Sequence, residues 1–307
     1  MLLSTNQIFK QAYQHYGIAA FNVFNAEQVW AVFSGASKCN MPVIIQITPA
    51  ARNYLSSEVL IQCIKATETK FPKVDYSIHL DHGNLEHCYN AIHSGHYKSV
   101  MIDASHETFS ENVRITREVV NLAHQKGIAV EAELGILSGI EDHLDIDSGS
   151  ARYTDPDQAK EFVKLTQCDS LAIAVGTSHG AYKFIGAQGL QLGILTKIHQ
   201  QLPGFPLVLH GASSVPYAEI ERINRAGGLL KESAKGIQKK ELLQAIKLGV
   251  CKINIATDIR LLWTRVHREF FKETPELFDM VVPGKKFMSE LESFVVEKCT
   301  GLIINEL

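Results

Sequence analysis

Residues 76–102, YSIHLDHGNLEHCYNAIHSGHYKSVMI, contain the pattern that decides the fold. A short apolar run over 76–80 is followed by a helical pattern over 85–93 and by a second apolar run over 99–102. Gly95 stands just after the helical pattern, where glycine most easily adopts a left-handed cap. This stretch therefore predicts a strand, a helix and another strand in succession.

The same alternation continues in both directions along the chain. Continuous apolar runs are typical of strands buried on both faces of a parallel sheet, and the helical patterns repeat apolar residues at i, i+3 and i+4. The eight predicted strands are residues 17–23, 43–48, 76–80, 99–102, 128–133, 170–175, 207–210 and 250–256. The predicted helices are residues 25–37, 57–69, 85–93, 111–125, 157–165, 190–200 and 240–248, and Pro156 and Pro216 stand where helices should start.

Eight strand–helix units in about 250 residues predict a (β/α)8 TIM barrel. A doubly wound sheet is the alternative, but the GxGxxG turn that usually follows its first strand is absent from the sequence. The chain has no linker rich in Pro, Gly or Ser, so we expect a single domain over residues 1–307. Residues 285–307 predict one further amphipathic helix as a C-terminal extension.

Composition excludes several classes of function. The 30 Lys and Arg residues nearly balance the 33 Asp and Glu residues, which argues against a general nucleic-acid-binding protein. The sequence contains no apolar run long enough to span a membrane and no signal-peptide pattern. The six cysteines lack CxxC spacing, so we expect free thiols in a reducing cytoplasm rather than a zinc finger or a thioredoxin site.

Three histidines stand at the ends of different predicted strands, where barrel enzymes carry their chemistry. His82, His179 and His210 each lie beside a glycine. Any one of them could be an ordinary buried or exposed histidine, but the three together would need three separate explanations. Three neutral imidazoles with an open fourth position are the layout of a catalytic zinc site. We therefore predict that these side chains converge on Zn²⁺.

Carboxylates occupy neighbouring strand ends. Asp81 directly precedes His82 and is suited either to general-base catalysis or to orienting a ligand histidine. Asp103 and Glu133 could bind the metal, tune it from a second layer, or form a salt bridge that lines the barrel.

The segment over 137–150, LSGIEDHLDIDSGS, follows the fifth predicted strand. Its glycines and polar residues predict a mobile loop or lid that could bring Glu141 or Asp142 over the site. The alternative is an acidic loop that is simply solvated.

Glycine-flanked turns, GTSHGAYK and HGASS, follow the sixth and seventh predicted strands. Backbone N–H groups in such turns can hold a phosphate, and a lysine adds charge, although the glycines could serve only to let the backbone turn. The candidate phosphate-binding residues are Gly180, Lys183, Gly211 and Ser213. The eighth predicted strand ends in NIATD, which adds Asn254 and Thr257 at the same end of the barrel.

The strings HLDHG, SVMIDASH, VEAELG, GTSHG and LVLHGAS occur in this order, after FNVFN at residue 21. In combination they resemble the class II, metal-dependent fructose-bisphosphate aldolases, nearly from end to end. The resemblance implies a zinc-dependent homodimer or homotetramer that cleaves fructose 1,6-bisphosphate reversibly to dihydroxyacetone phosphate and glyceraldehyde 3-phosphate. It also implies that zinc is held by His82, His179 and His210, with Asp103 and Glu133 at an alternative, more buried metal position.

The resemblance further implies roles in catalysis and substrate binding. Asp81 would exchange the proton of the substrate C4 hydroxyl, and Glu141 the proton at C3 of the dihydroxyacetone phosphate part. Asn254 would contact the substrate. The phosphate of the dihydroxyacetone phosphate part would be bound, with the help of a monovalent cation such as Na⁺ or K⁺, by Gly180, Lys183, Gly211, Ser213 and Thr257.

Two strings depart from the family pattern. Fructose-type members commonly have an NTDTD-like string at the eighth strand, but Ala256 here replaces an acidic residue, as in tagatose-type members. The family usually has Asp-Pro-Arg before its last helix, whereas this chain has DMV with Val281 in place of the arginine that binds the distal phosphate. Tagatose 1,6-bisphosphate or another ketose phosphate therefore stays open as substrate, and so does a non-catalytic phosphosugar-binding barrel.

A lysine-dependent mechanism is a further alternative. Lys252 lies on the eighth predicted strand, and composition does not exclude it as a Schiff-base nucleophile. With zinc at the site, this lysine should be dispensable as a nucleophile.

Overall fold

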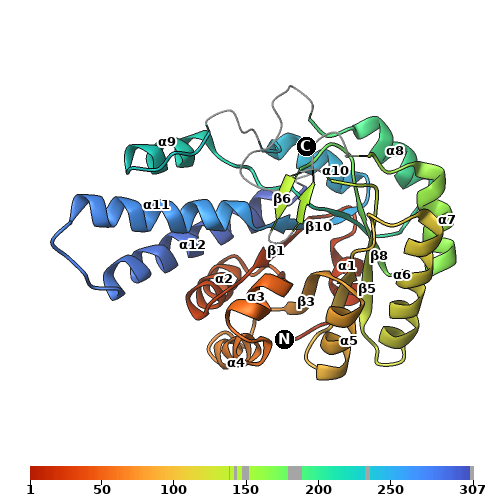
Figure 1. The fold of residues 1–307 in the computed structure, drawn as a ribbon, viewed down its shortest axis with the longest axis horizontal. Helices are drawn as coiled ribbons and strands as arrows, with labels where there is room; N and C mark the ends of the chain where they lie inside the picture. Colours follow the sequence, from red (N-terminus) through yellow and green to blue (C-terminus); the bar gives the residue numbers. More distant parts are fainter. Residues whose placement is uncertain (138, 142–143, 147–151, 179–188, 232–235, 305–307) are drawn as a thin grey trace.

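A closed barrel of eight parallel strands forms the centre of the computed structural model, which describes residues 1–137, 139–141, 144–146, 152–178, 189–231 and 236–304 (Figure 1). The strands lie in the order β1-β10-β9-β8-β5-β4-β3-β2. Their bounds are β1 (Ile18–Asn22), β2 (Val43–Ile47), β3 (Tyr76–Gly83), β4 (Ser99–Ile102), β5 (Ala129–Leu134), β8 (Ser170–Ile173), β9 (Leu207–Leu209) and β10 (Val250–Ile255). The predicted (β/α)8 barrel is thereby confirmed, and the doubly wound alternative is wrong.

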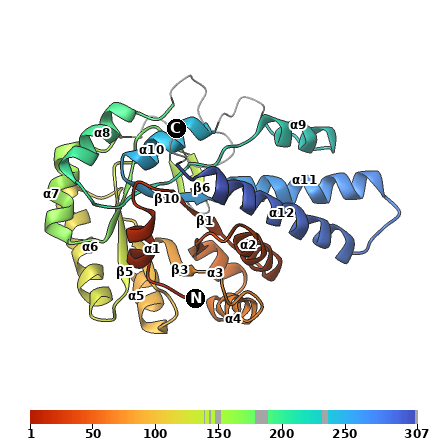
Figure 2. The same ribbon diagram turned by 180° about the vertical axis from the view of Figure 1, so that it is seen from behind.

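Helices surround the barrel, and each of the seven predicted helices is present to within a few residues at its ends (Figure 2). They are α2 (Ala26–Cys39), α4 (Ser57–Glu68), α5 (Leu85–Ser94), α6 (Phe109–His124), α7 (Pro156–Thr166), α8 (Leu192–Gln201) and α10 (Lys239–Lys247). Four further described helices lie outside the predicted ranges, although α9 begins at the helix start predicted for Pro216. They are α1 (Thr5–Ala12), α3 (Pro49–Tyr54), α9 (Tyr217–Arg225) and α11 (Thr257–Glu273).

Helix α1 covers the end of the barrel at which the strands begin. Its side chains Ile8 and Phe9 pack with Ile18 and Ile44, which stand near the start of β1 and β2. The site must therefore lie at the other end, where the strands finish.

Apolar and polar side chains alternate along the strands more than the continuous apolar runs of the sequence predict. Outward-facing residues such as Phe21 and Val100 belong to the large apolar core under the helices, as expected for side chains that alternate across a strand. The alternate positions, whose side chains point into the barrel, are mostly polar although they are buried. These polar residues are Asn22, Gln46, Ser77, His79, Asp81, Ser99, Glu131, Glu133, Ser170, Lys252 and Asn254. Much of the barrel interior is consequently lined by hydrogen-bonding groups that need partners, beside a small apolar cluster of Met101, Ala172 and Val208.

The predicted C-terminal extension is helix α12 (Val281–Gly301), which begins four residues earlier than expected. It packs on α2 where Gly35 has no side chain, because a Cβ atom there would lie 2.6 Å from Val295. Figures 1 and 2 show α11 and α12 running side by side and projecting away from the barrel. That all 307 residues form one domain stays a prediction. Among the described helices, none combines the length and the apolar character that crossing a bilayer requires.

Candidate active site

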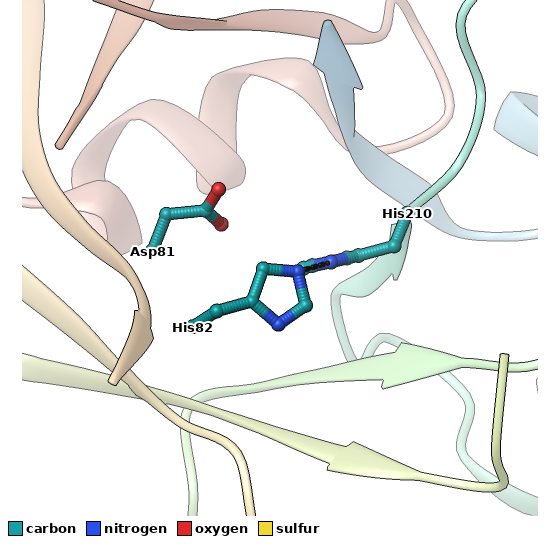
Figure 3. A group of neighbouring side chains, drawn as sticks. All are labelled: Asp81, His82 and His210. Carbon is teal, nitrogen blue, oxygen red and sulfur yellow. Dashed lines mark hydrogen bonds between the residues drawn. The ribbon is translucent and has the colours of Figure 1, made fainter. Parts of the chain in front are cut away.

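Asp81 and His82 are consecutive on β3, yet both side chains point toward His210, which directly follows β9 (Figure 3). A regular strand would direct consecutive side chains to opposite faces. The pairing of β3 with β4 shifts its register between Leu80 and Gly83, and His82 has φ = 49°, a left-handed conformation that is uncommon outside glycine. This β-bulge turns His82 into the mouth of the barrel, where Asp81 already points.

The two histidine rings are held by carboxylates. His82 Nδ1 lies 2.9 Å from Asp103 Oδ2, and His210 Nε2 lies 2.9 Å from Glu131 Oε1. Because a carboxylate only accepts hydrogen bonds, these nitrogens carry the protons. The other two nitrogens, His82 Nε2 and His210 Nδ1, face each other at 2.8 Å.

That short separation tests whether the residues fit a metal. Two unprotonated nitrogens would repel each other at 2.8 Å, so without a cation one of the two rings must hold a second proton. One ligand atom each of Asp81, His82 and His210 lies within 4.8 Å of the others. The two imidazole nitrogens therefore fit a cation such as Zn²⁺, which imidazole nitrogen binds readily, and the Asp81 carboxylate lies beside them.

Asp103 and Glu133 form a second possible group with His82. Burial disfavours a charged Asp103, but hydrogen bonds from His82 and Ser105 outweigh this effect and hold the pKa of Asp103 well below its usual value. Glu133 Oε2 lies 4.0 Å from His82 Nδ1. The structure thus brings both predicted carboxylates to His82, where either could bind a metal or orient the ring.

Asp81 is fixed by two amides. Asn22 Nδ2 donates to Asp81 Oδ2 at 2.8 Å, and Asn254 Nδ2 donates to Oδ1 at 3.1 Å. Gln46 Nε2 donates in turn to Asn22 Oδ1 at 2.8 Å. Within the described part of the chain, the buried Oδ1 of Asn254 has no hydrogen-bond partner and is available to a bound molecule. Asp81 is therefore a buried acceptor of defined orientation beside the two histidines.

The predicted phosphate turn after β9 packs tightly against the segment after β8. Gly211 has φ = 59°, and a Cβ atom there would lie 2.4 Å from the carbonyl oxygen of Ser178. Glycine is thus required for the close approach of two backbones, and Ser213 is buried beside it. This packing supports the plainer interpretation of the glycine and leaves phosphate binding as a prediction.

Asp258 holds the same turn from the next element. Its carboxylate accepts hydrogen bonds from the backbone N–H groups of Ser214 and Val215, and Lys298 of α12 lies 3.3 Å away. Thr257 is the first residue of α11 and follows directly on the strand predicted over residues 250–256, of which β10 covers Val250–Ile255. Its position at a helix N-terminus is one where anions are favoured.

Several predicted site residues lie outside the part of the chain that the structure describes. His179, Gly180, Lys183 and Asp142 are not among the described residues. Glu141 ends strand β6 (Gly139–Glu141), which pairs antiparallel with β7 (Leu144–Ile146), and its side chain is not described. The segment expected to form a mobile loop or lid thus carries a short hairpin where it is described, and its role as a lid stays a prediction.

The two departures from the family pattern lie in different places. Ala256 is buried immediately before α11, next to the mouth of the barrel. Val281 opens α12, and that end of the helix lies at the tip of the two-helix projection, away from the barrel (Figure 1). Within one chain, position 281 therefore lies far from the mouth.

Three polar residues of the interior, Asn22, Gln46 and Glu131, have no predicted role in the site, and Lys252 was predicted there only as a possible Schiff-base nucleophile. The signal for them was the polar residue at alternate positions of an otherwise apolar run, which marks the inward face of a strand.

Comparisons with known proteins agree with this geometry. The family model described as fructose-bisphosphate aldolase class-II matches residues 3–303. A fructose-bisphosphate aldolase of Giardia intestinalis is 43% identical over 296 residues, covering 94% of this chain and 90% of that protein. One of Thermus caldophilus is 42% identical over 281 residues, covering 91% and 90%. Among solved structures, the YdjI aldolase of Escherichia coli K12 is 30% identical with a TM-score of 0.78, covering 98% of this chain and 97% of that one.

Proposed function

This chain belongs to the class II fructose-bisphosphate aldolase family and is a lyase of that class, and on this premise we propose that it cleaves fructose 1,6-bisphosphate with the help of zinc. The products would be dihydroxyacetone phosphate and glyceraldehyde 3-phosphate, and the reaction would run in either direction, for glycolysis or gluconeogenesis. The observation that carries the proposal is the pair of facing nitrogens of His82 and His210 beside the carboxylate of Asp81.

His82 Nε2, His210 Nδ1 and the side chain of His179 are the proposed zinc ligands. Three protein ligands with one open position are the usual arrangement of a catalytic zinc site. When bound, zinc would supply Lewis-acid stabilisation of the negative charge that develops on substrate oxygens as the C3–C4 bond breaks. Asp103 and Glu133 are the proposed alternative metal position.

Asp81 is proposed to exchange the proton of the C4 hydroxyl. Cleavage requires this hydroxyl to lose its proton, and a carboxylate within hydrogen-bond reach can accept it. The amides of Asn22 and Asn254 fix the orientation of the carboxylate and leave lone pairs on both oxygens. Glu141, on the β6–β7 hairpin, is proposed to exchange the proton at C3.

The phosphate of the dihydroxyacetone part is proposed to lie between the turns after β8 and β9 and the start of α11. The contacts of Asp258 with Ser214 and Val215 keep one of these turns in place. The residues assigned to this phosphate are Gly180, Lys183, Gly211, Ser213 and Thr257, with a monovalent cation. Asn254 would contact the substrate.

Arg260 is the proposed donor to the distal phosphate. A cavity of about 800 Å³ extends beside the ends of β1, β2 and β3, lined among others by Phe24, Asn84, Arg260 and Trp263. The guanidinium group lies 5.2 Å from the centre of the Phe24 ring. Arginine is well suited to phosphate because its donors match two phosphate oxygens at once.

Tagatose 1,6-bisphosphate is the second candidate substrate, favoured by Ala256 at the mouth. A coupled cleavage assay that compares fructose and tagatose bisphosphates with their 1-phosphates distinguishes the candidates. We expect the highest kcat/KM for fructose 1,6-bisphosphate. A clear preference for the tagatose compound would overturn the substrate assignment while leaving the aldolase class intact, and no cleavage of any of them would favour a non-catalytic phosphosugar-binding barrel.

A homodimer or homotetramer is also proposed. The tip of the α11–α12 projection exposes Phe278 by 96% and Met280 by 82%, and neighbouring apolar residues extend this patch. Contiguous exposed apolar surface is typical of protein interfaces. We further propose a cytoplasmic location, which the six unpaired cysteines support.

A further inference from the structure

Lys252 is a fully buried cation one layer below the candidate site. It stands on β10, two residues before Asn254, and its side chain is 0% exposed. Its Nζ lies 2.9 Å and 2.8 Å from the two carboxylate oxygens of Glu131 and 3.2 Å from His79 Nε2. An ammonium group has three protons, and these three contacts use all of them.

A neutral histidine, His79, contacts the ammonium group of Lys252 beside Glu131. Burial, together with the charge of Lys252, holds the pKa of His79 well below its usual value. The uncharged ring therefore accepts from Lys252 at Nε2 and donates from Nδ1 to Ser99 Oγ at 2.6 Å. The direction of every hydrogen bond on this side of Lys252 is thereby fixed.

The other side of the group reaches a proposed zinc ligand. Glu131 Oε1, already bound to Lys252, also lies 2.9 Å from His210 Nε2. Because the carboxylate cannot donate, Nε2 carries the proton and Nδ1 keeps the lone pair. The Nδ1 atom is the one that faces His82, and the amide of Asn254 lies against the same ring.

We propose that Lys252 and Glu131 are a positioning pair for His210: the lysine fixes the carboxylate, and the carboxylate selects the tautomer and ring orientation that present Nδ1 to the metal. This inference rests on the proposed function for the identity of the metal. Partners of this kind behind a metal-binding histidine fix its tautomer in other metal sites.

Both charges are needed for this selection. A glutamine at position 131 could donate as well as accept, so it would permit either tautomer of His210. Without the ammonium group, nothing would hold the carboxylate in place, and a buried charge would lose its partner.

The same contacts explain why Lys252 is unsuited to form a Schiff base. An amine attacks a carbonyl through its lone pair, and the ammonium of Lys252 has none while all three protons are donated.

The test uses Glu131→Gln, Lys252→Met and the double variant that combines them. Imidazole ¹⁵N chemical shifts of the metal-free protein report which nitrogen of His210 is protonated. We expect Nε2 to carry the proton in the unmodified chain and the proton to be shared between both nitrogens in each variant. Competition with a chromophoric chelator should show Zn²⁺ affinity reduced by roughly 10-fold to 100-fold in each single variant.

Arg265→Met is the matched control, because Arg265 is also a buried cation among carboxylates, those of Glu219, Glu269 and Glu290, but lies on α11. It should lose stability while Zn²⁺ affinity stays unchanged. The double variant has no unpaired buried charge, so it should regain the stability that the single variants lose while its Zn²⁺ affinity stays low.

Unchanged His210 protonation and Zn²⁺ affinity in the folded variants would overturn the proposal, and so would a double variant with full affinity. If the unmodified chain binds no Zn²⁺, the proposed function fails, whereas the ¹⁵N measurement still decides the role of the pair.

Discussion

Asp81 is the side chain on which the proposed chemistry depends most directly. Its replacement by alanine removes the proton acceptor but none of the proposed zinc ligands. We therefore expect Asp81→Ala to retain zinc and to lose about 100-fold to 10,000-fold in kcat, the usual contribution of a general base. Steady-state kinetics and metal analysis of the same preparation measure both quantities. Asp157→Asn, an exposed change on α7, is the control, and a kcat near the unmodified value for Asp81→Ala would refute the proton role.

Arg260 supplies a second prediction about a single residue. Arg260→Ala removes the guanidinium group from the 800 Å³ cavity. KM for fructose 1,6-bisphosphate should rise about 10-fold or more, as expected when a charged hydrogen bond is lost. The KM for fructose 1-phosphate, which lacks the distal phosphate, should change little. An equal rise for both substrates would place the distal phosphate elsewhere.

The position of a residue at the mouth of the barrel was predictable where a polar side chain interrupts or directly follows an apolar run at a strand end. His82, His210, Asp81 and Asp103 are of this kind. Glu131 and Lys252 were not, because their contact joins residues 121 positions apart and only the closed barrel brings them together. The sequence around a buried lysine does not indicate which distant residue it contacts.

The β-bulge in β3 makes a prediction at the scale of one element. Gly83 allows the bulge, since a Cβ atom would lie 2.7 Å from the Leu80 side chain and 3.0 Å from the carbonyl oxygen of Met101. Gly83→Ala should lower the free energy of unfolding by about 1–3 kcal/mol, as overpacking in a core does. It should also weaken Zn²⁺ binding, because the bulge aims His82.

Gly193→Ala is the control for that change. Gly193 lies in α8, and a Cβ atom there meets nothing within 4 Å. Alanine in a helix should be neutral or slightly stabilising. Urea unfolding and chelator competition compare the two variants, and normal stability and Zn²⁺ affinity of Gly83→Ala would contradict the role of the bulge.

Helices with a regular apolar periodicity were predictable from the sequence. Helices that are very short or begin without a capping residue were not. The periodicity of α6 and α7 gave nearly correct bounds. Helix α3 has only six residues, too few for a period, and α11 begins directly after Ala256, which forms no side-chain cap. The β-bulge in β3 could not be predicted either, because the sequence shows only that Asp81 and His82 are adjacent.

At the scale of the whole molecule, the barrel was predictable because eight similar units repeat along the chain. What the sequence could not show is which polar residues of the barrel interior lie beside one another, since that depends on the register between strands. The register places Gln46 beside His79 and His79 beside Ser99. These pairings turn separate polar residues into one buried set below the site.

The apolar tip of the α11–α12 projection tests the proposed oligomer. Phe278→Asp places a charge in the exposed patch and should shift the protein toward monomer in sedimentation velocity. Leu229→Asp is the control, because Leu229 is equally exposed at 96% but follows α9 instead. Unchanged mass for Phe278→Asp would place the interface elsewhere.

Metal removal and restoration measures the central claim most directly. Cleavage of fructose 1,6-bisphosphate should disappear after exhaustive chelation and return on addition of stoichiometric Zn²⁺, because His82 and His210 would hold the ion that stabilises the developing charge. Borohydride added with substrate should trap no covalent adduct, since Lys252 is buried in its ion pair. Cleavage that survives chelation and is instead abolished by borohydride trapping would contradict the account.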